Sequence, residues 1–131
     1  MTIRKLASGG SVNPSIPLSP GIAAGGFVFV SGQVGIDPTS GSIADGVRAQ
    51  TRLALANIEH ILAQAGLTRA AVVRTTVYLL DITEFAAMNE EYGAFFSEPR
   101  PTRTTVGIAG LAVAGLLVEI DAIAVTSTEG A

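Results

Sequence analysis

Apolar residues along this chain follow two periods, an alternation typical of strands and a spacing of three and four typical of helices. β-Branched or wholly apolar segments predict strands at residues 3–8, 21–24, 27–34, 72–80, 101–109 and 116–125. Helical spacing predicts one helix that Asp45 caps and Gly66 ends, and a second that Asp81 or Thr83 opens and that runs through Phe96. This order predicts an α+β fold, in which a single mixed sheet carries two helices packed on one face.

The helical stripes predict which side chains pack on the sheet. In the first helix they are Ala54, Ile58, Ile61, Leu62 and Ala65, and in the second Phe85, Met88, Tyr92 and Phe95. The long connection through the first helix predicts a parallel crossover between the strands on either side of it. The other face of the sheet still carries Phe27 and Phe29, or their neighbours, together with apolar residues of the last strand, and no third helix is predicted to cover it. We therefore expect copies of the chain to associate as a homo-oligomer.

Composition narrows the class of protein. The length of 131 residues fits one domain, 1–131, and the absence of cysteine excludes thiol nucleophiles, iron–sulfur clusters and disulfides. A net charge of −3 without a Lys/Arg cluster argues against nucleic-acid binding. No segment resembles a membrane span or a secretory leader, so a cytoplasmic location is expected. His60, the only histidine, is predicted to face solvent, and neither a metal site nor a cofactor is expected.

Two connections are defined by their turn residues. Three prolines between residues 13 and 20 exclude regular structure, and composition fits an ordered loop and a flexible arm equally well. Gly25 and Gly26 predict a tight hairpin turn between the second and third strands.

The candidate chemistry lies in the last two strands, where Arg103 and Glu119 interrupt sequence that otherwise reads as buried. Strand alternation places Arg103 on one face with Thr105, and Glu119 on one face with Asp121. A guanidinium removed from water without a partner costs several kcal/mol, so its presence there needs a reason. The pattern leaves two interpretations open. Arg103 and Glu119 form either a salt bridge within the fold or a catalytic site, and in a catalytic site Glu119 could come from another subunit.

Six blocks of sequence, in order, carry a family resemblance. They are VSGQV at 30–34, DPTSG at 37–41, RTTVYL at 74–79, FAAMNEEYGAFF at 85–96, PTR at 101–103 and VEIDAIA at 118–124. Together they resemble the RidA/YjgF family of reactive-intermediate (enamine/imine) deaminases, over nearly the whole chain. The resemblance implies a chorismate-mutase-like fold and a homotrimer whose three clefts lie between subunits.

The resemblance also implies roles for individual residues. Arg103 matches the arginine that binds the substrate carboxylate, and Glu119 matches the glutamate that positions the attacking water. Further matches to cleft positions are Ser31, Gly32 and Asn89, while Leu18 and Thr105 stand where many members have tyrosine and cysteine. From the residues alone, Ser31 and Gly32 also fit a strand-end device, and Asn89 a hydrogen bond to backbone. The loop before the last strand has Gly110, Ala112 and Ala114 in place of the family's usual Arg, Pro and Asp.

The implied reaction is hydrolysis of small 2-imino or 2-enamino acids, such as 2-iminopropanoate from 2-aminoacrylate, to the 2-oxo acid and ammonia without a cofactor. The altered pocket residues motivate two alternatives, a pathway-specific deaminase of an enamine such as 3-aminoacrylate and a non-catalytic regulatory trimer that binds small carboxylates. RNA cleavage or protein holding is a third role, and the acidic composition disfavours RNA.

Overall fold

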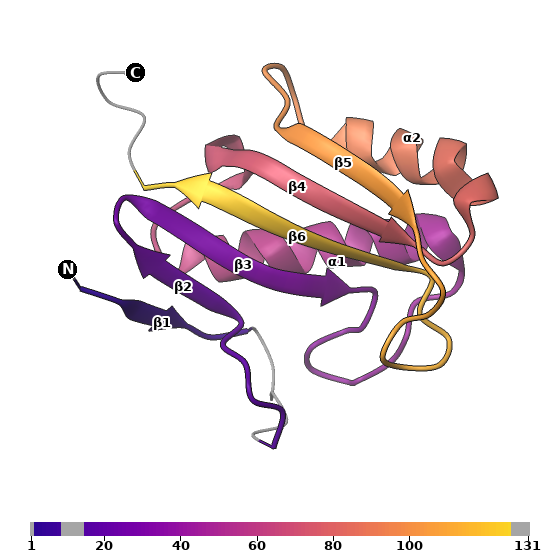
Figure 1. The fold of residues 1–131 in the computed structure, drawn as a ribbon, viewed down its shortest axis with the longest axis horizontal. Helices are drawn as coiled ribbons and strands as arrows, with labels where there is room; N and C mark the ends of the chain where they lie inside the picture. The colour runs from indigo at the N-terminus through magenta and orange to yellow at the C-terminus, as the bar shows by residue number, and fades with distance from the viewer. Residues whose placement is uncertain (1, 9–14, 127–131) are drawn as a thin grey trace.

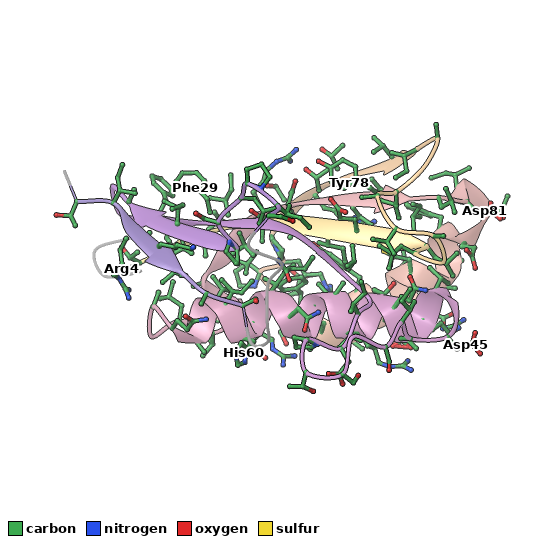
Figure 2. The ribbon with its side chains drawn as sticks, turned by 90° about the horizontal axis from the view of Figure 1, so that it is seen from below. Arg4, Phe29, Asp45, His60, Tyr78 and Asp81 are labelled. Carbon is green, nitrogen blue, oxygen red and sulfur yellow. The ribbon has the colours of Figure 1, made fainter. Side chains whose placement is uncertain are left out.

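Six strands form one mixed sheet in the computed structural model, which describes residues 2–8 and 15–126 (Figure 1). The strands are β1 (Arg4–Leu6), β2 (Gly21–Ala24), β3 (Phe27–Val34), β4 (Val72–Leu79), β5 (Thr102–Gly107) and β6 (Val118–Val125), and the helices are α1 (Gly46–Ala63) and α2 (Phe85–Phe95). The strand order is β1-β2-β3-β6-β4-β5, and only the β4–β5 pair is parallel. Both helices lie on one face, and Phe29 and Tyr78 on the other (Figure 2). The predicted α+β architecture is confirmed.

Helix α1 has the boundaries and the buried stripe that its sequence predicts. Asp45 occupies the N-cap position in an extended conformation, although its side chain makes no capping hydrogen bond. Beyond the C-terminus, Gly66 takes a φ of +73°, which only glycine adopts without strain. Ala54, Ile58, Ile61 and Leu62 are buried against the sheet, Ala65 is partly buried, and His60 is exposed.

Helix α2 differs from its prediction at the N-terminal end. Asp81 caps a single 3₁₀ turn (Ile82–Glu84) by accepting a hydrogen bond from the Thr83 N–H at 2.9 Å, and the α-helix begins only at Phe85. Met88 and Tyr92 are buried as predicted, whereas Phe85 is 41% exposed, so its assignment to the core was wrong. The physical reason is that the start of α2 lies over the edge strand β5, beyond which the sheet offers no further surface to cover the ring.

The strand order could not be read from the alternation pattern. β3 and β4 are parallel to each other, as the crossover predicts, but β6 lies between them and pairs antiparallel with both. The two strands that carry Arg103 and Glu119 do not pair, because β4 lies between β5 and β6. Several strands are also shorter than predicted, most clearly β1, which spans Arg4–Leu6 rather than residues 3–8.

A buried glutamine fixes the chain just before β6. Gln50 of α1 is 1% exposed, and its Nε2 donates to the carbonyl oxygens of Ala44 and Gly115, both at 3.0 Å. Its Oε1 accepts from the Leu117 N–H at 2.7 Å. Because the buried Gln50 amide bonds backbone groups on both sides of Leu116, the end of the loop before β6 is held at a defined position two residues from Glu119.

The sheet face without helices, which we call the open face, carries exposed apolar side chains. Phe27 and Phe29 are 43% and 46% exposed, and their ring centroids lie 6.1 Å apart. Val106 of β5 pairs with Tyr78 on the same face and is also exposed. Such a patch is typical of surfaces that contact another protein. Among the described residues, no helix has the length and apolarity needed to cross a membrane.

Candidate functional site

Arg103 lies on the helix face of the edge strand β5, under helix α2. Its cross-strand partner Thr75 is fully buried on the same face. The guanidinium carbon lies 4.7 Å from the ring centroid of Tyr92 and 5.6 Å from that of Phe85, and Nη1 is 3.9 Å from the Met88 sulfur. Within the described part of the chain, no carboxylate lies at ion-pair distance from Arg103. The half-buried cation is therefore held by aromatic rings and remains available to an anion.

Tyr92 is a rigid platform for this guanidinium. Its hydroxyl lies 2.6 Å from Thr75 Oγ1, and its ring packs against Phe96 with centroids 4.9 Å apart. Burial raises the pKa of the Tyr92 hydroxyl, while the Thr75 hydrogen bond and the positive charge of Arg103 oppose that rise. The helical spacing predicted Tyr92 as a core residue only, and its second role beside Arg103 depends on the pairing of β4 with β5.

Two polar side chains on β5 and on the helix that covers it have buried oxygens without a hydrogen-bond partner among the described residues. They are Asn89 Oδ1 on α2 and Thr105 Oγ1 on β5, two residues beyond Arg103 on the same face of the strand. The interpretation that the Asn89 oxygen bonds the backbone is thus not supported. Buried polar atoms without partners are uncommon in folded proteins, so both oxygens are candidates to accept a hydrogen bond from a bound molecule.

Glu119 lies on the open face, where β6 pairs with β4 on one side and β3 on the other. Its direct cross-strand partners are Tyr78 and Val34. The carboxylate lies over Gly32, where a Cβ atom would come within 2.2 Å of Glu119 Oε2. The register of β3 against β6 shifts between Val30 and Gln33, so Gly32 belongs to an irregular segment of the strand. Burial, and after it the charge of Asp121, raise the pKa of Glu119 above its usual 4.5.

Arg103 and Glu119 therefore lie on opposite faces of the sheet. Arg103 shares its face with buried Thr75, and Glu119 shares its face with Tyr78, which points away from the helices (Figure 2). The two side chains form no ion pair with each other. A salt bridge between them within the fold, one of the two interpretations of the sequence, is thus wrong, and a single chain does not bring the two groups together.

Ser31 fastens the proline-rich loop to β3. Its Oγ donates to the Ser19 carbonyl at 2.7 Å, and its N–H donates to the Pro20 carbonyl at 2.9 Å. Residues 15–20 are thus an ordered loop, whereas residues 13 and 14 lie outside the described residues. Leu18 projects from this loop and is 50% exposed. These two hydrogen bonds show that Ser31 holds the loop against β3, and they leave the Leu18 side chain exposed.

Two hollows in the described part of the chain lie away from both charges. One of about 280 Å³ is lined by Arg52, Ala56, Arg69, Glu91, Ala94 and Phe95 between the helices. A smaller one of about 150 Å³ lies beside Phe96 and Pro99, and neither includes Arg103 or Glu119. Among residues 2–8 and 15–126, no group of three or more His, Asp or Glu side chains gathers as a metal site would require.

Known proteins are similar to this chain over most of its length. A family model described as Endoribonuclease L-PSP matches residues 10–126. A 2-iminobutanoate/2-iminopropanoate deaminase of Salmonella typhimurium is 40% identical over 112 residues, which cover 83% of this chain and 87% of that protein. The chain belongs to the RidA/YjgF family. A RutC family protein of Pyrococcus horikoshii is 45% identical over 112 residues, covering 85% and 88% of the two chains.

Solved structures of RidA/YjgF proteins share the fold. The YjgF gene product of E. coli superimposes with a TM-score of 0.85 at 34% identity, covering 93% of this chain and 98% of that one. A RidA from the Antarctic bacterium Psychrobacter sp. gives a TM-score of 0.86 at 33% identity, with the same coverage. The resemblance inferred from the six sequence blocks is therefore confirmed.

Proposed function

We propose that this RidA/YjgF member hydrolyses small 2-imino and 2-enamino acids, such as 2-iminopropanoate, to the 2-oxo acid and ammonia. The observation that carries the proposal is the guanidinium of Arg103, which lies on the ring of Tyr92 and has no carboxylate partner among the residues that the structure describes. A guanidinium presents a planar pair of donors that matches a carboxylate in bidentate fashion. The Salmonella relative, named as an imine deaminase, supports the same substrate class.

Glu119 supplies the proton transfers of this reaction. A water molecule adds to the electrophilic C=N carbon while Glu119 accepts one of its protons and passes it to the imine nitrogen, which gives a neutral carbinolamine. Glu119 then accepts the proton of the new hydroxyl group and passes it to the amino nitrogen, so the C=O bond forms, the C–N bond breaks and ammonia leaves. The sum is imine plus water to 2-oxo acid plus ammonia, so no cofactor is required. The raised pKa of Glu119 suits a group that must both accept and donate a proton near neutral pH.

The cleft wall around these groups is proposed to come from five further residues. They are Ser31, Gly32, Asn89, Thr105 and Leu18. The unpaired oxygens of Asn89 and Thr105 are suited to accept hydrogen bonds from the substrate nitrogen or from water. Leu18 provides an apolar contact where many relatives have a phenol.

A second copy of the chain is proposed to complete each site. Arg103 and Glu119 lie on opposite faces of one sheet, and the apolar open face with Phe27 and Phe29 is uncovered. A homotrimer with three clefts between subunits would cover that face and bring Arg103 of one copy to Glu119 of the next.

The shared cleft predicts complementation between two inactive variants. Chains with Arg103→Ala and chains with Glu119→Gln are each expected to be inactive, because every cleft then lacks one group. Co-expressed in equal amounts with different tags, they are expected to recover about a quarter of the wild-type activity, since random assembly gives both intact groups to about one cleft in four. No recovery in verified mixed oligomers would show that both groups act from one chain.

Gly32→Ala tests whether the position of the Glu119 carboxylate matters. The added methyl group overlaps the flexible end of the glutamate, so Glu119 is expected to turn away while stability changes by no more than about 1 kcal/mol. Displacement of a reacting group by roughly 1 Å can lower the rate of an enzymatic reaction by about 10²-fold. We therefore expect kcat to fall about 10- to 100-fold. Gly93→Ala on α2, where a Cβ meets nothing within 4 Å, is the matched control and is expected to leave kcat unchanged. A wild-type kcat in Gly32→Ala would contradict this placement.

The activity itself is tested by generating 2-iminopropanoate with an amino-acid oxidase and following its decay and the release of ammonia. Wild-type protein is expected to accelerate imine decay and ammonia release above their rates in buffer. Arg103→Ala is expected to leave both at the buffer rates. Equal rates for the two proteins would remove the enzyme interpretation.

Two alternatives are separated by related measurements. A panel that includes 3-aminoacrylate tests whether Leu18, Thr105 and the altered loop favour a pathway-specific enamine. Calorimetric binding of 2-oxo acids without imine hydrolysis would favour a regulatory carboxylate-binding trimer. RNA cleavage, which the family description mentions, is disfavoured by the net charge of −3.

A further inference from the structure

Asp121 is held in a fixed orientation beside Glu119. It follows Glu119 by two residues on β6, so both side chains lie on the open face. Its Oδ1 accepts from the Thr76 backbone N–H at 3.1 Å, and its Oδ2 accepts from the Tyr78 hydroxyl at 3.0 Å. With one oxygen bound to backbone and the other to a phenol, the carboxylate cannot turn away from Glu119 without losing a hydrogen bond.

Tyr78 completes this arrangement because it is also the direct cross-strand partner of Glu119. Burial, and after it the hydrogen bond to Asp121, raise the pKa of Tyr78, and the charge of Glu119 adds to this rise. The Tyr78 hydroxyl donates a hydrogen bond to Asp121, and its pKa is raised by the negative charges of both Asp121 and Glu119. Figure 2 shows Tyr78 on the open face.

The other charged groups near Glu119 do not offset Asp121. On the β3 side, Glu119 is faced by Gly32 and Val34, which carry no charge. On β4, Arg74 lies near the opposite end of the strand, and its Nη2 donates to Thr104 on β5 at 2.8 Å. Among these charged groups, Asp121 on β6 therefore has the largest electrostatic effect on Glu119.

We propose that Asp121 is a positioning residue that favours the protonated form of Glu119 through its fixed negative charge, and that the Tyr78 hydroxyl moderates this effect. Like charges in proximity disfavour a second ionisation. The raised pKa of Glu119, which burial causes first and Asp121 second, agrees with this geometry.

The effect of Asp121 on Glu119 does not depend on the proposed function. Only the transfer of the Glu119 proton to the substrate rests on it. A Glu119 that holds its proton at higher pH is ready to give it to the departing nitrogen, and the carboxylate form that accepts a proton from water is correspondingly more basic. Asp121 acts through Glu119 alone and is proposed to contact neither the substrate nor the attacking water.

The test is a titration of Glu119 in the whole protein by carbon NMR of labelled glutamate, with its signal identified by its absence from Glu119→Gln. Asp121→Asn keeps an acceptor for the Thr76 N–H but removes the charge, so the midpoint of Glu119 is expected to fall. Tyr78→Phe removes the hydroxyl that offsets the charge, so the midpoint is expected to rise. Asp45→Asn, at the exposed N-cap of α1 away from the sheet (Figure 2), is the matched control and is expected to leave it unchanged.

The limb of the kcat–pH profile that reports the ionisation of Glu119 is expected to shift in the same way. It moves to lower pH in Asp121→Asn and to higher pH in Tyr78→Phe. An unchanged or higher midpoint in Asp121→Asn would overturn the inference. If that variant fails to fold, an unchanged or lower midpoint in Tyr78→Phe would overturn it instead. Because the titration needs no substrate, it decides the inference even if wild-type protein fails to hydrolyse imines, in which case only the proposed function falls.

Discussion

Arg103→Lys is expected to lower kcat/KM for 2-iminopropanoate roughly 10- to 100-fold, mainly through a higher KM. Lysine keeps the positive charge but offers a point donor in place of the planar fork, and it loses the stacking of the guanidinium on Tyr92. A hydrogen bond to a charged group contributes about 1.5–3 kcal/mol, and every 1.4 kcal/mol is about a factor of ten. Arg103→Ala removes the positive charge as well. It is expected to lower kcat/KM by at least about 100-fold for the same reason.

The measurement is a full set of kinetic constants for both variants together with calorimetric binding of a 2-oxo acid. Arg48→Ala is the matched control, because Arg48 is exposed on α1 and its ion pair with Glu90 at 2.6 Å lies in solvent. It is expected to change neither constant. A wild-type KM in Arg103→Lys would show that the guanidinium does not bind the substrate carboxylate.

Glu119→Gln is expected to lower kcat by about 10²- to 10⁴-fold, the usual contribution of a general acid–base group. The amide is close in shape to the carboxyl but cannot exchange a proton with water or with the departing nitrogen. Binding of a 2-oxo acid through Arg103 is expected to survive, which separates loss of proton transfer from loss of the site.

The same variant is expected to be more stable than wild type at neutral pH. The pKa of Glu119 is raised in the folded protein by burial and by Asp121, so the folded state favours the protonated form. The stability that this group contributes is present below its unfolded pKa and is lost as the pH rises through its folded pKa. The advantage of Glu119→Gln is therefore expected to be absent at low pH and to grow as wild-type Glu119 ionises.

Thermal unfolding from acid to neutral pH measures this difference, with Glu90→Gln on exposed α2 surface as the control. A Glu119→Gln variant that loses stability relative to wild type as the pH rises would contradict the sign of the shift. A variant that keeps wild-type kcat would remove Glu119 from the reaction.

The elements of this fold were predictable because each depends on a local pattern. The period of α1 placed Ile58 and Leu62 in the core, and Gly66 marked its end, since these effects act within a few residues. Alternation correctly placed Thr105 with Arg103 and Asp121 with Glu119, because successive side chains of a strand point to opposite faces. An uncovered apolar face was predicted from the lack of a third helix, and the structure shows that Phe27 and Phe29, rather than their neighbours, lie on it.

Strand neighbours were not predictable from the alternation of single strands. Nothing in the residues of β5 or β6 indicates that β4 lies between them, since pairing is chosen by the packing of the whole sheet. The placement of Arg103 beneath α2 and of Glu119 on the open face depends on this order. Phe85 was misassigned for the same reason, because its helical position says nothing about where the sheet ends.

The residues around the two charges were only partly visible in the sequence. Tyr92 followed the apolar spacing of α2, so its contact with a guanidinium could not be distinguished from ordinary core packing. Gly32 matched the family pattern, but the reason for a glycine there emerged only from the overlap that a Cβ would make with Glu119. Both cases depend on contacts between segments far apart in the chain.

The anchoring of Gln50 has a consequence for engineering the substrate range. Because this one side chain fixes Gly115 and Leu117 from the helix beneath, the exposed residues before them, including Ala112 and Ala114, contribute little to holding the fold. Segments of different length or polarity could therefore be grafted between Ile108 and Gly115 while β6 keeps its register. This connection can therefore be exchanged to test whether it sets the selectivity of the proposed cleft, while the rest of the fold is kept.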